Sequence, residues 1–237
     1  MQLLKNLYQV GGSLSGLTHT EIVDPFDDCN VYVLKLASQL IMFDCGNGET
    51  LEQIFDNMAY WNLDPAQITT CFLTHPHWDH AGATHLLKER GIKLISHSNT
   101  ANAIAAGDER CCGFLYHKTF VPCQVDETID DNEIMTIEDT KIRAIHLPGH
   151  TTGCTAFALN WNGKRIFFSG DVIGTLGYGG FGWDGSVDFD KKMYLQSLKK
   201  FARMDFDVML PGHGLVSFYQ PKRRVEESLN AALMQWR

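Results

Sequence analysis

Four side chains that can bind a metal ion lie within the six-residue segment His75-Pro76-His77-Trp78-Asp79-His80. The segment directly follows an apolar run of strand length, so it begins where a strand is expected to end. Residues i and i+2 of an extended chain project to the same side, so His75 and His77 can bind one ion. Once the chain turns, Asp79 and His80 can face a second ion. The alternative is a polar loop that is rich in histidine by chance.

Three more residues of the same chemistry occur further along, and each follows a predicted strand. A strand end presents its side chains at the edge of a sheet, where they can join the first cluster. Together the residues supply five imidazoles and two carboxylates, a set that suits Zn²⁺, with iron or manganese as alternatives. We therefore expect two metal ions per chain, with Zn²⁺ as the first choice. The additional segments are Leu147-Pro148-Gly149-His150-Thr151, Ser169-Gly170-Asp171 and Leu210-Pro211-Gly212-His213-Gly214.

The elements that must position these side chains follow from the hydrophobic periodicity. Apolar runs of strand length alternate with amphipathic stretches along the whole chain, which predicts a mixed α/β protein in which helices cover sheets. One amphipathic stretch has apolar residues at i, i+3, i+4 and i+7, namely Leu51, Ile54, Phe55 and Met58. The expected helical segments are 51–58, a short turn at 64–67, 86–90, 194–201 and 225–236. The expected strands are 31–36, 40–43, 70–73, 92–95, 141–147, 155–161, 165–168 and 207–210.

The metal-binding motifs resemble the signature of the metallo-β-lactamase superfamily, which is His-x-His-x-Asp-His followed by a distant histidine, a bridging aspartate and a final histidine. All seven positions are matched in order, and the resemblance covers the chain from about Asp44 to His213. It implies an α/β fold of the four-layer αββα sandwich type, with a dinuclear site at one edge between the sheets. No linker divides the chain, so we interpret residues 1–237 as a single domain of this type.

The resemblance also implies how the ligands divide between the two ions. Asp79 and Asp171 are the two carboxylates of this set, and we assign both to the catalytic centre. Asp44, in the segment Phe43-Asp44-Cys45-Gly46, resembles the acid that orients the ligands from behind in these proteins. The implied set is His75, His77 and His150 for the first ion, Asp79, His80 and His213 for the second, and Asp171 as the bridge.

Two divalent ions, two carboxylates and a bridging hydroxide leave such a site with a net positive charge. A cationic site that holds a hydroxide can attack a carbonyl or phosphoryl centre and stabilise the resulting oxyanion. Neither a Gly-x-Ser-x-Gly elbow nor a Gly-rich phosphate loop competes with this interpretation. We therefore expect a metal-dependent hydrolase that cleaves a small ester, thioester or lactone.

Other members of the superfamily provide the alternatives. A persulfide dioxygenase-like enzyme keeps much of the motif but uses one iron. A glyoxalase II-like thioesterase shares the metal set, but it carries a C-terminal helical domain, and the 24 residues after His213 suffice for one helix. Class B β-lactamases usually lack the bridging aspartate, and similar lactonases often have a tyrosine where this chain has Val172-Ile173-Gly174. A non-catalytic metal-binding protein is the remaining alternative.

Composition excludes several other classes of protein. The chain has 237 residues, a formal net charge of −8 and 44% apolar residues, which suffice for a large core. An acidic balance without a Lys/Arg stripe argues against a nucleic-acid partner, and no apolar run is long enough to span a membrane. The seven cysteines include no Cys-x-x-Cys pair, and the N-terminus does not resemble a secretory signal. We expect a cytoplasmic protein with a small-molecule substrate and no nucleic-acid or membrane partner; its oligomeric state stays open.

Two segments, 107–125 and 174–189, lack clear periodicity, and long irregular segments in a compact domain are often functional. The second begins three residues after Asp171, so we expect it to form a wall of the substrate pocket. Its aromatic residues Tyr178, Phe181 and Trp183 are the candidate substrate contacts. In the first segment, His117 is the histidine outside the motif that we consider for the pocket.

Overall fold

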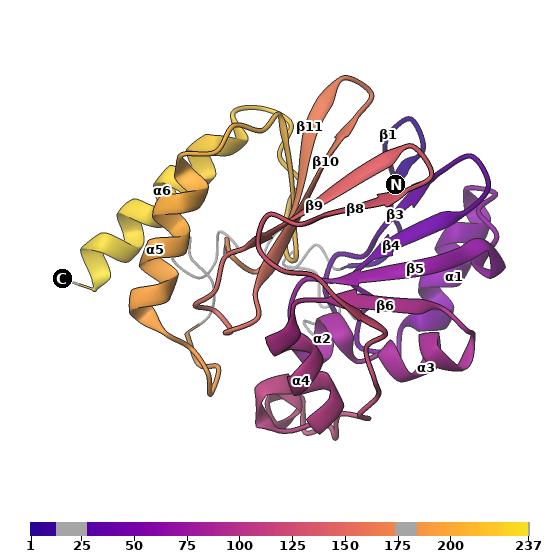
Figure 1. Cartoon of the computed structure of the whole chain (residues 1–237), viewed down its shortest axis with the longest axis horizontal. Coiled ribbons are helices and arrows are strands. Elements are labelled where there is room, and N and C mark those ends of the chain that lie inside the picture. The colour runs from indigo at the N-terminus through magenta and orange to yellow at the C-terminus, as the bar shows by residue number, and fades with distance from the viewer. Residues whose placement is uncertain (13–27, 174–183, 237) are drawn as a thin grey trace, which may run out of the picture.

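The computed structural model describes residues 1–12, 28–173 and 184–236. Two β-sheets lie face to face in the middle of the molecule, and helices cover both outer faces (Figure 1). Helices α5 (Lys191–Ala202) and α6 (Pro221–Gln235) lie outside one sheet, and α1 (Leu51–Tyr60) and α3 (Thr84–Glu89) lie outside the other. The expected four-layer αββα sandwich is therefore confirmed.

The two sheets are both mixed. In the first, β4 to β7 run parallel, and in the second β11 and β12 run parallel; the other neighbouring pairs are antiparallel. The first sheet follows chain order, with β1 (Gln2–Leu4), β2 (Leu7–Gln9), β3 (Tyr32–Lys35), β4 (Leu40–Phe43), β5 (Ile68–Leu73), β6 (Lys93–Ser96) and β7 (Glu127–Thr128). The second has the order β12 (Val208–Pro211), β11 (Lys164–Gly170), β10 (Thr155–Trp161), β9 (Thr140–His146) and β8 (Ile134–Ile137).

The remaining helical elements are short and lie near the metal-binding motif or in the connections. They are α2 (Trp78–Ala81), α4 (Ser98–Ala106) and the 3₁₀ turns η1 (Pro65–Gln67), η2 (Glu109–Cys111) and η3 (Gly113–Tyr116). Asp64 caps η1 by accepting a hydrogen bond from the amide of Ala66, as expected from the Asp-Pro sequence there. Among the described helices, none has the length and apolar character that crossing a bilayer requires.

Central strands are apolar on both faces because both faces are covered. In β4, Leu40 and Met42 pack toward the helices, whereas Ile41 and Phe43 pack toward the other sheet. The core between the sheets is aromatic: the ring of Phe43 stacks on that of Phe168 with centroids 3.7 Å apart. This contact joins the two sheets one residue before Asp44 in the first and three residues before Asp171 in the second.

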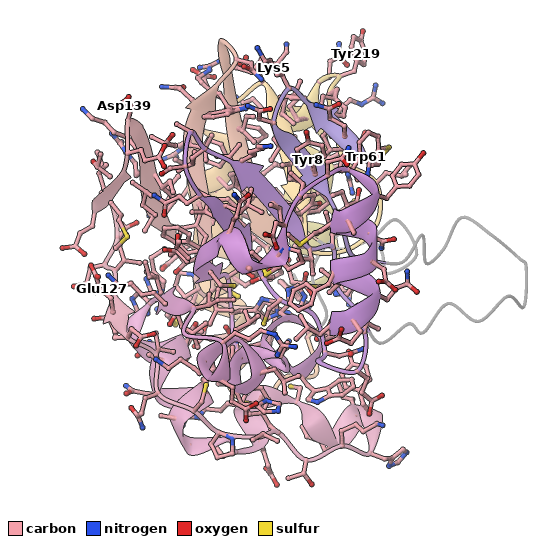
Figure 2. All side chains as sticks on the ribbon, turned by 90° about the vertical axis from the view of Figure 1, so that its right-hand side faces the viewer. Lys5, Tyr8, Trp61, Glu127, Asp139 and Tyr219 are labelled. Atoms are coloured by element: carbon pink, nitrogen blue, oxygen red, sulfur yellow. The ribbon has the colours of Figure 1, made fainter. Side chains whose placement is uncertain are left out.

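Near the β1 edge of the first sheet, the C-terminus of α1 packs against β2. Tyr8 and Trp61 lie side by side in Figure 2, and their ring centroids are 5.7 Å apart. Leu51, Ile54 and Met58 are the buried positions of α1, which is the stripe expected from the sequence.

The expected strands and helices are all present, with boundaries shifted by a few residues. The elements that were not expected are strands β1, β2, β7 and β8, helices α2 and α4, and the 3₁₀ turns η2 and η3. Helix α4 combines Ser, Asn and Thr, which have low helix propensity, with four alanines, which have the highest, and its sequence has no wide apolar stripe. It forms because Thr100, Ala103 and Ile104 are buried, and it ends at Gly107, whose φ of 61° suits glycine. All seven cysteines are free thiols, and six of them are buried.

Candidate metal centre

All of the expected ligands lie at one edge of the sandwich because each follows the carboxyl end of a strand. His75 and His77 follow β5, and Asp79 and His80 belong to α2, the short helix that comes next. On the second sheet, His150 follows β9, Asp171 follows β11 and His213 follows β12. Strands β9, β11 and β12 run in the same direction, since each of β9 and β11 is antiparallel to β10.

The first group of ligand atoms comes from His75, His77 and His150. One nitrogen from each ring lies within 4.8 Å of the others, and all three residues are buried. His77 Nδ1 and His150 Nε2 are 3.1 Å apart. His75 Nε2 is buried and has no hydrogen-bond partner among the described residues. A buried polar nitrogen without a partner is costly, and a metal ion in this group removes that cost.

The second group comes from Asp79, His80 and His213, whose ligand atoms also lie within 4.8 Å of one another. His213 Nε2 is 2.9 Å from Asp79 Oδ2 and 3.2 Å from His80 Nε2. One carboxylate and two imidazole nitrogens facing the same point form an N/O set that fits a divalent cation.

Asp171 lies between the two groups. Its carboxylate oxygens are 3.4 Å from His80 Nε2, 3.5 Å from His213 Nε2 and 3.7 Å from His150 Nε2. Oδ1 is buried without a hydrogen-bond partner in the described part of the chain. The structure thus brings all seven expected ligands together and places the expected bridging carboxylate between the two groups.

Asp44 contacts His80 on the side of the imidazole ring opposite the nitrogen that faces the other ligands. Its Oδ2 is 2.9 Å from His80 Nδ1, and it accepts hydrogen bonds from the amide and hydroxyl of Thr74. Thr74 Oγ1 in turn lies 3.0 Å from His75 Nδ1. Because the Thr74 hydroxyl donates to Asp44, its oxygen can accept from His75 Nδ1–H, which leaves His75 Nε2 free to bind metal. Sequence reasoning missed Thr74, although it directly precedes the motif.

Electrostatics differ between the two groups. Burial and the neighbouring histidines lower the pKa of His75 well below its usual value and lower that of His77 to about 3. Burial also opposes protonation of His213, but the Asp171 and Asp79 carboxylates outweigh it and raise the His213 pKa. For His80, burial is outweighed by the neighbouring Cys29 sulfur and by the nearby carboxylates, which together raise its pKa. The surroundings of the first group therefore favour neutral imidazoles, whereas negatively charged neighbours favour protonated imidazoles in the second group.

A glycine allows the ligands to approach the β12 loop. A Cβ atom on Gly212 would lie 2.2 Å from Asp171 Oδ1 and 2.6 Å from His80 Cε1. The Gly212 amide donates to the Gly170 carbonyl at 2.9 Å, which joins the ends of β11 and β12. Glycine at position 212 is therefore required for the compact arrangement of the second group.

The irregular segment 107–125 lies beside the metal-binding motif. The ring of Tyr116 packs against that of Trp78, with centroids 5.0 Å apart, and Cys112 Sγ lies 3.9 Å from Ser186 Oγ. His117 is exposed, with a φ of 54°, and it belongs to neither ligand group. The expected substrate contacts Tyr178, Phe181 and Trp183 lie outside the described residues.

Fold and side-chain geometry together define an αββα sandwich with two adjacent groups of potential metal ligands at one edge. A family model described as metallo-β-lactamase superfamily matches residues 24–213. The chain therefore belongs to the metallo-β-lactamase superfamily, as the resemblance implied, and the prediction of an enzyme of this superfamily is confirmed.

Individual relatives agree with this assignment. An atrochrysone carboxyl ACP thioesterase of Aspergillus fumigatus is 30% identical over 188 residues, which are 79% of this chain and 51% of the relative. A β-lactamase-like protein 2 homolog of Drosophila melanogaster is 30% identical over 209 residues, or 85% of this chain and 63% of that protein. This chain thus spans between half and two thirds of the length of these two relatives.

A solved structure with the same fold is a subclass B3 metallo-β-lactamase of Bradyrhizobium japonicum. It superposes with a TM-score of 0.75 at 24% identity, covering 99% of this chain and 91% of that one. At this level of identity the likeness establishes the fold, and the reaction must be argued from the site.

Proposed function

We propose that this protein is a dinuclear metallo-hydrolase that cleaves a thioester, with small esters and lactones as the related substrates to compare. The observation that carries the proposal is the convergence of seven nitrogen and oxygen ligands in two groups that share Asp171. When bound there, two divalent ions would supply a hydroxide nucleophile from water at neutral pH and polarise the carbonyl to be attacked.

The chain's own residues supply position and charge. His75, His77 and His150 direct three imidazole nitrogens at one point. Asp79 and Asp171 supply two negatively charged carboxylates, which would offset part of the charge of two cations. Five imidazoles with two carboxylates and no thiolate are a set typical of Zn²⁺, which we propose as the native metal.

The name of a relative favours thioesters over other acyl substrates, and exposed apolar side chains provide surface for the acyl group that all of these substrates share. The Aspergillus fumigatus relative is named a thioesterase that acts on an acyl carrier protein. In this chain, apolar side chains are exposed in the two segments that contain Cys112 and Ser186: Phe114 and Leu115 follow Cys112 in η3, and Val187 follows Ser186. Since Cys112 contacts Ser186, these side chains belong to neighbouring segments, and they offer apolar surface for an acyl group.

The test combines metal analysis with a substrate screen. We expect about two zinc ions per chain and hydrolysis of acyl thioesters faster than of matched oxygen esters, lactones, phosphodiesters and β-lactams. His150→Ala should lower kcat/KM by roughly 100-fold or more, because the first group loses one of three ligands. His117→Ala is the matched control, since this histidine is exposed and belongs to neither group; it should leave the rate unchanged.

Two outcomes would overturn the proposal. One iron per chain together with consumption of O₂ during thiol oxidation would identify an oxygenase of the same fold. Full metal loading with no hydrolysis of any acyl substrate would identify a metal-binding protein without this activity.

A further inference from the structure

Ser186 connects the first ligand group to a part of the chain with no place in the metal motif. Its hydroxyl oxygen lies 3.3 Å from His77 Nε2, the ring nitrogen opposite the one that faces His150. The Ser186 side chain is buried. The contact joins residues that are 109 positions apart in the sequence, so only the fold brings them together.

The direction of this hydrogen bond is set by Asp188. The Ser186 hydroxyl donates to Asp188 Oδ1 at 2.7 Å, so its proton is committed to the carboxylate and its oxygen is an acceptor. His77 Nε2 must then carry the ring hydrogen and donate it to Ser186. In a neutral imidazole the other nitrogen, Nδ1, is consequently unprotonated, and Nδ1 is the atom that lies among the ligands of the first group.

Asp188 also holds the loop that carries His150. Its Oδ2 accepts hydrogen bonds from the Thr152 amide at 2.9 Å and from the Thr152 hydroxyl at 2.8 Å. Burial opposes ionisation of Asp188, but these bonds from Thr152 and Ser186 outweigh it and lower the pKa of the carboxyl. Nearby, the Asp190 amide donates to the Gly149 carbonyl at 2.9 Å. One carboxylate thus fixes the ring of His77 and the backbone two residues after His150.

We propose that Ser186 and Asp188 are positioning residues for the first ligand group. They orient the ring of His77, set its tautomer and fix the position of the loop that carries His150. The inference rests on the proposed metal loading. It assigns no role to the second group, because His80 is oriented by Asp44 instead. Losing Ser186 should therefore weaken one of the two metal sites and spare the other.

The experiment measures zinc affinity in two backgrounds, each of which keeps one group intact. His213→Ala retains the first group, and His150→Ala retains the second. In the His213→Ala background, Ser186→Ala should raise the free zinc concentration at half-saturation about 10- to 100-fold, the usual effect of losing a hydrogen-bond partner of a ligand. In the His150→Ala background the same substitution should leave zinc affinity unchanged.

Two further variants separate positioning from a general effect on the fold. Ser186→Thr keeps the hydroxyl and should restore most of the zinc affinity, whereas Asp188→Asn should weaken the first group as Ser186→Ala does. Ser96→Ala is the matched control: Ser96 is also buried and hydrogen-bonded, but to the carbonyl of His97 rather than to a ligand. Ser96→Ala should not change zinc affinity in either background.

The outcomes are distinguishable. If the wild-type protein binds two zinc ions and Ser186→Ala has no effect, or weakens both groups equally, the positioning role is wrong and the proposed function stands. If Ser186→Ala does not fold, the zinc affinities of Asp188→Asn and Ser186→Thr in the same two backgrounds decide instead. If the wild-type protein binds no metal, the proposed function fails and this inference fails with it.

Discussion

Asp44 Oδ2 lies 2.9 Å from His80 Nδ1, on the opposite side of the imidazole from the nitrogen that faces Asp171. A carboxylate in this place fixes the ring orientation and increases the basicity of Nε2. Asp44 itself adopts a left-handed backbone conformation with a φ of 53°, which turns the chain at the end of β4. The ligand histidine is therefore supported by a residue that the first sheet positions.

Asp44→Asn is expected to weaken metal binding by the second group about 10- to 100-fold, because an amide cannot provide the charge behind His80. The measurement is zinc content after dialysis against a graded series of chelator concentrations. Asp64→Asn is the control, since Asp64 also accepts a hydrogen bond from a backbone amide, but in an exposed turn at η1. Equal zinc retention by wild type and Asp44→Asn would show that Asp44 does not orient the ligand.

Asp171→Ala is expected to lower occupancy in both groups, because its carboxylate lies within 3.7 Å of ligand nitrogens from each. Without this shared anion, two neighbouring cations repel each other more strongly. Elemental analysis should detect fewer than two ions per chain, and turnover should fall with them. A variant that keeps both ions and full turnover would remove Asp171 from the bridging role.

Gly212→Ala tests a steric requirement rather than a ligand. The new methyl group would overlap Asp171 Oδ1 and His80 Cε1, so the second group must open and zinc affinity should decrease. The control is Gly163→Ala, whose added Cβ meets nothing within 4 Å; its positive φ of 74° should reduce thermal stability without changing zinc affinity. Unchanged zinc binding by Gly212→Ala would indicate that β12 can move away from the ligands.

Much of this arrangement could be predicted from local sequence. The His75–His80 motif is contiguous, and the other three ligands each follow an apolar strand, so type and spacing alone predicted the cluster. The interior strands were also recognisable, because β4 and the C-terminal half of β5 are apolar on both faces.

Other parts could not be predicted because they depend on contacts between distant segments. Helix α4 lacks a wide apolar stripe in its sequence, and the burial of Thr100, Ala103 and Ile104 becomes evident only in the fold. Ser186 looks like an ordinary loop serine until the fold places it against His77. Thr74 was within reach of sequence reasoning, since a threonine that precedes a ligand histidine at a strand end can bond to it; Asp188 was not, because its partners come from two different loops.

The opposite pKa shifts in the two ligand groups predict that the metal ions are lost in two steps as the pH falls. The raised pKa values of His80 and His213 mean that, without metal, these rings hold protons above about pH 6.5, so protons compete with the second ion there first. The lowered pKa values of His75 and His77 keep those rings neutral below that pH, so the first ion should persist to lower pH. Metal content per chain, measured between about pH 8 and pH 4.5, should fall from two to one and then to zero.

The variants identify which step belongs to which group. His213→Ala should remove the step at higher pH, and His150→Ala should remove the step at lower pH. Added Zn²⁺ should shift both steps to lower pH, because metal and protons compete for the same nitrogens. Two results would contradict the electrostatic difference between the groups. Either both ions are lost at the same pH, or the ion bound by His80 and His213 remains to lower pH than the ion bound by the first group.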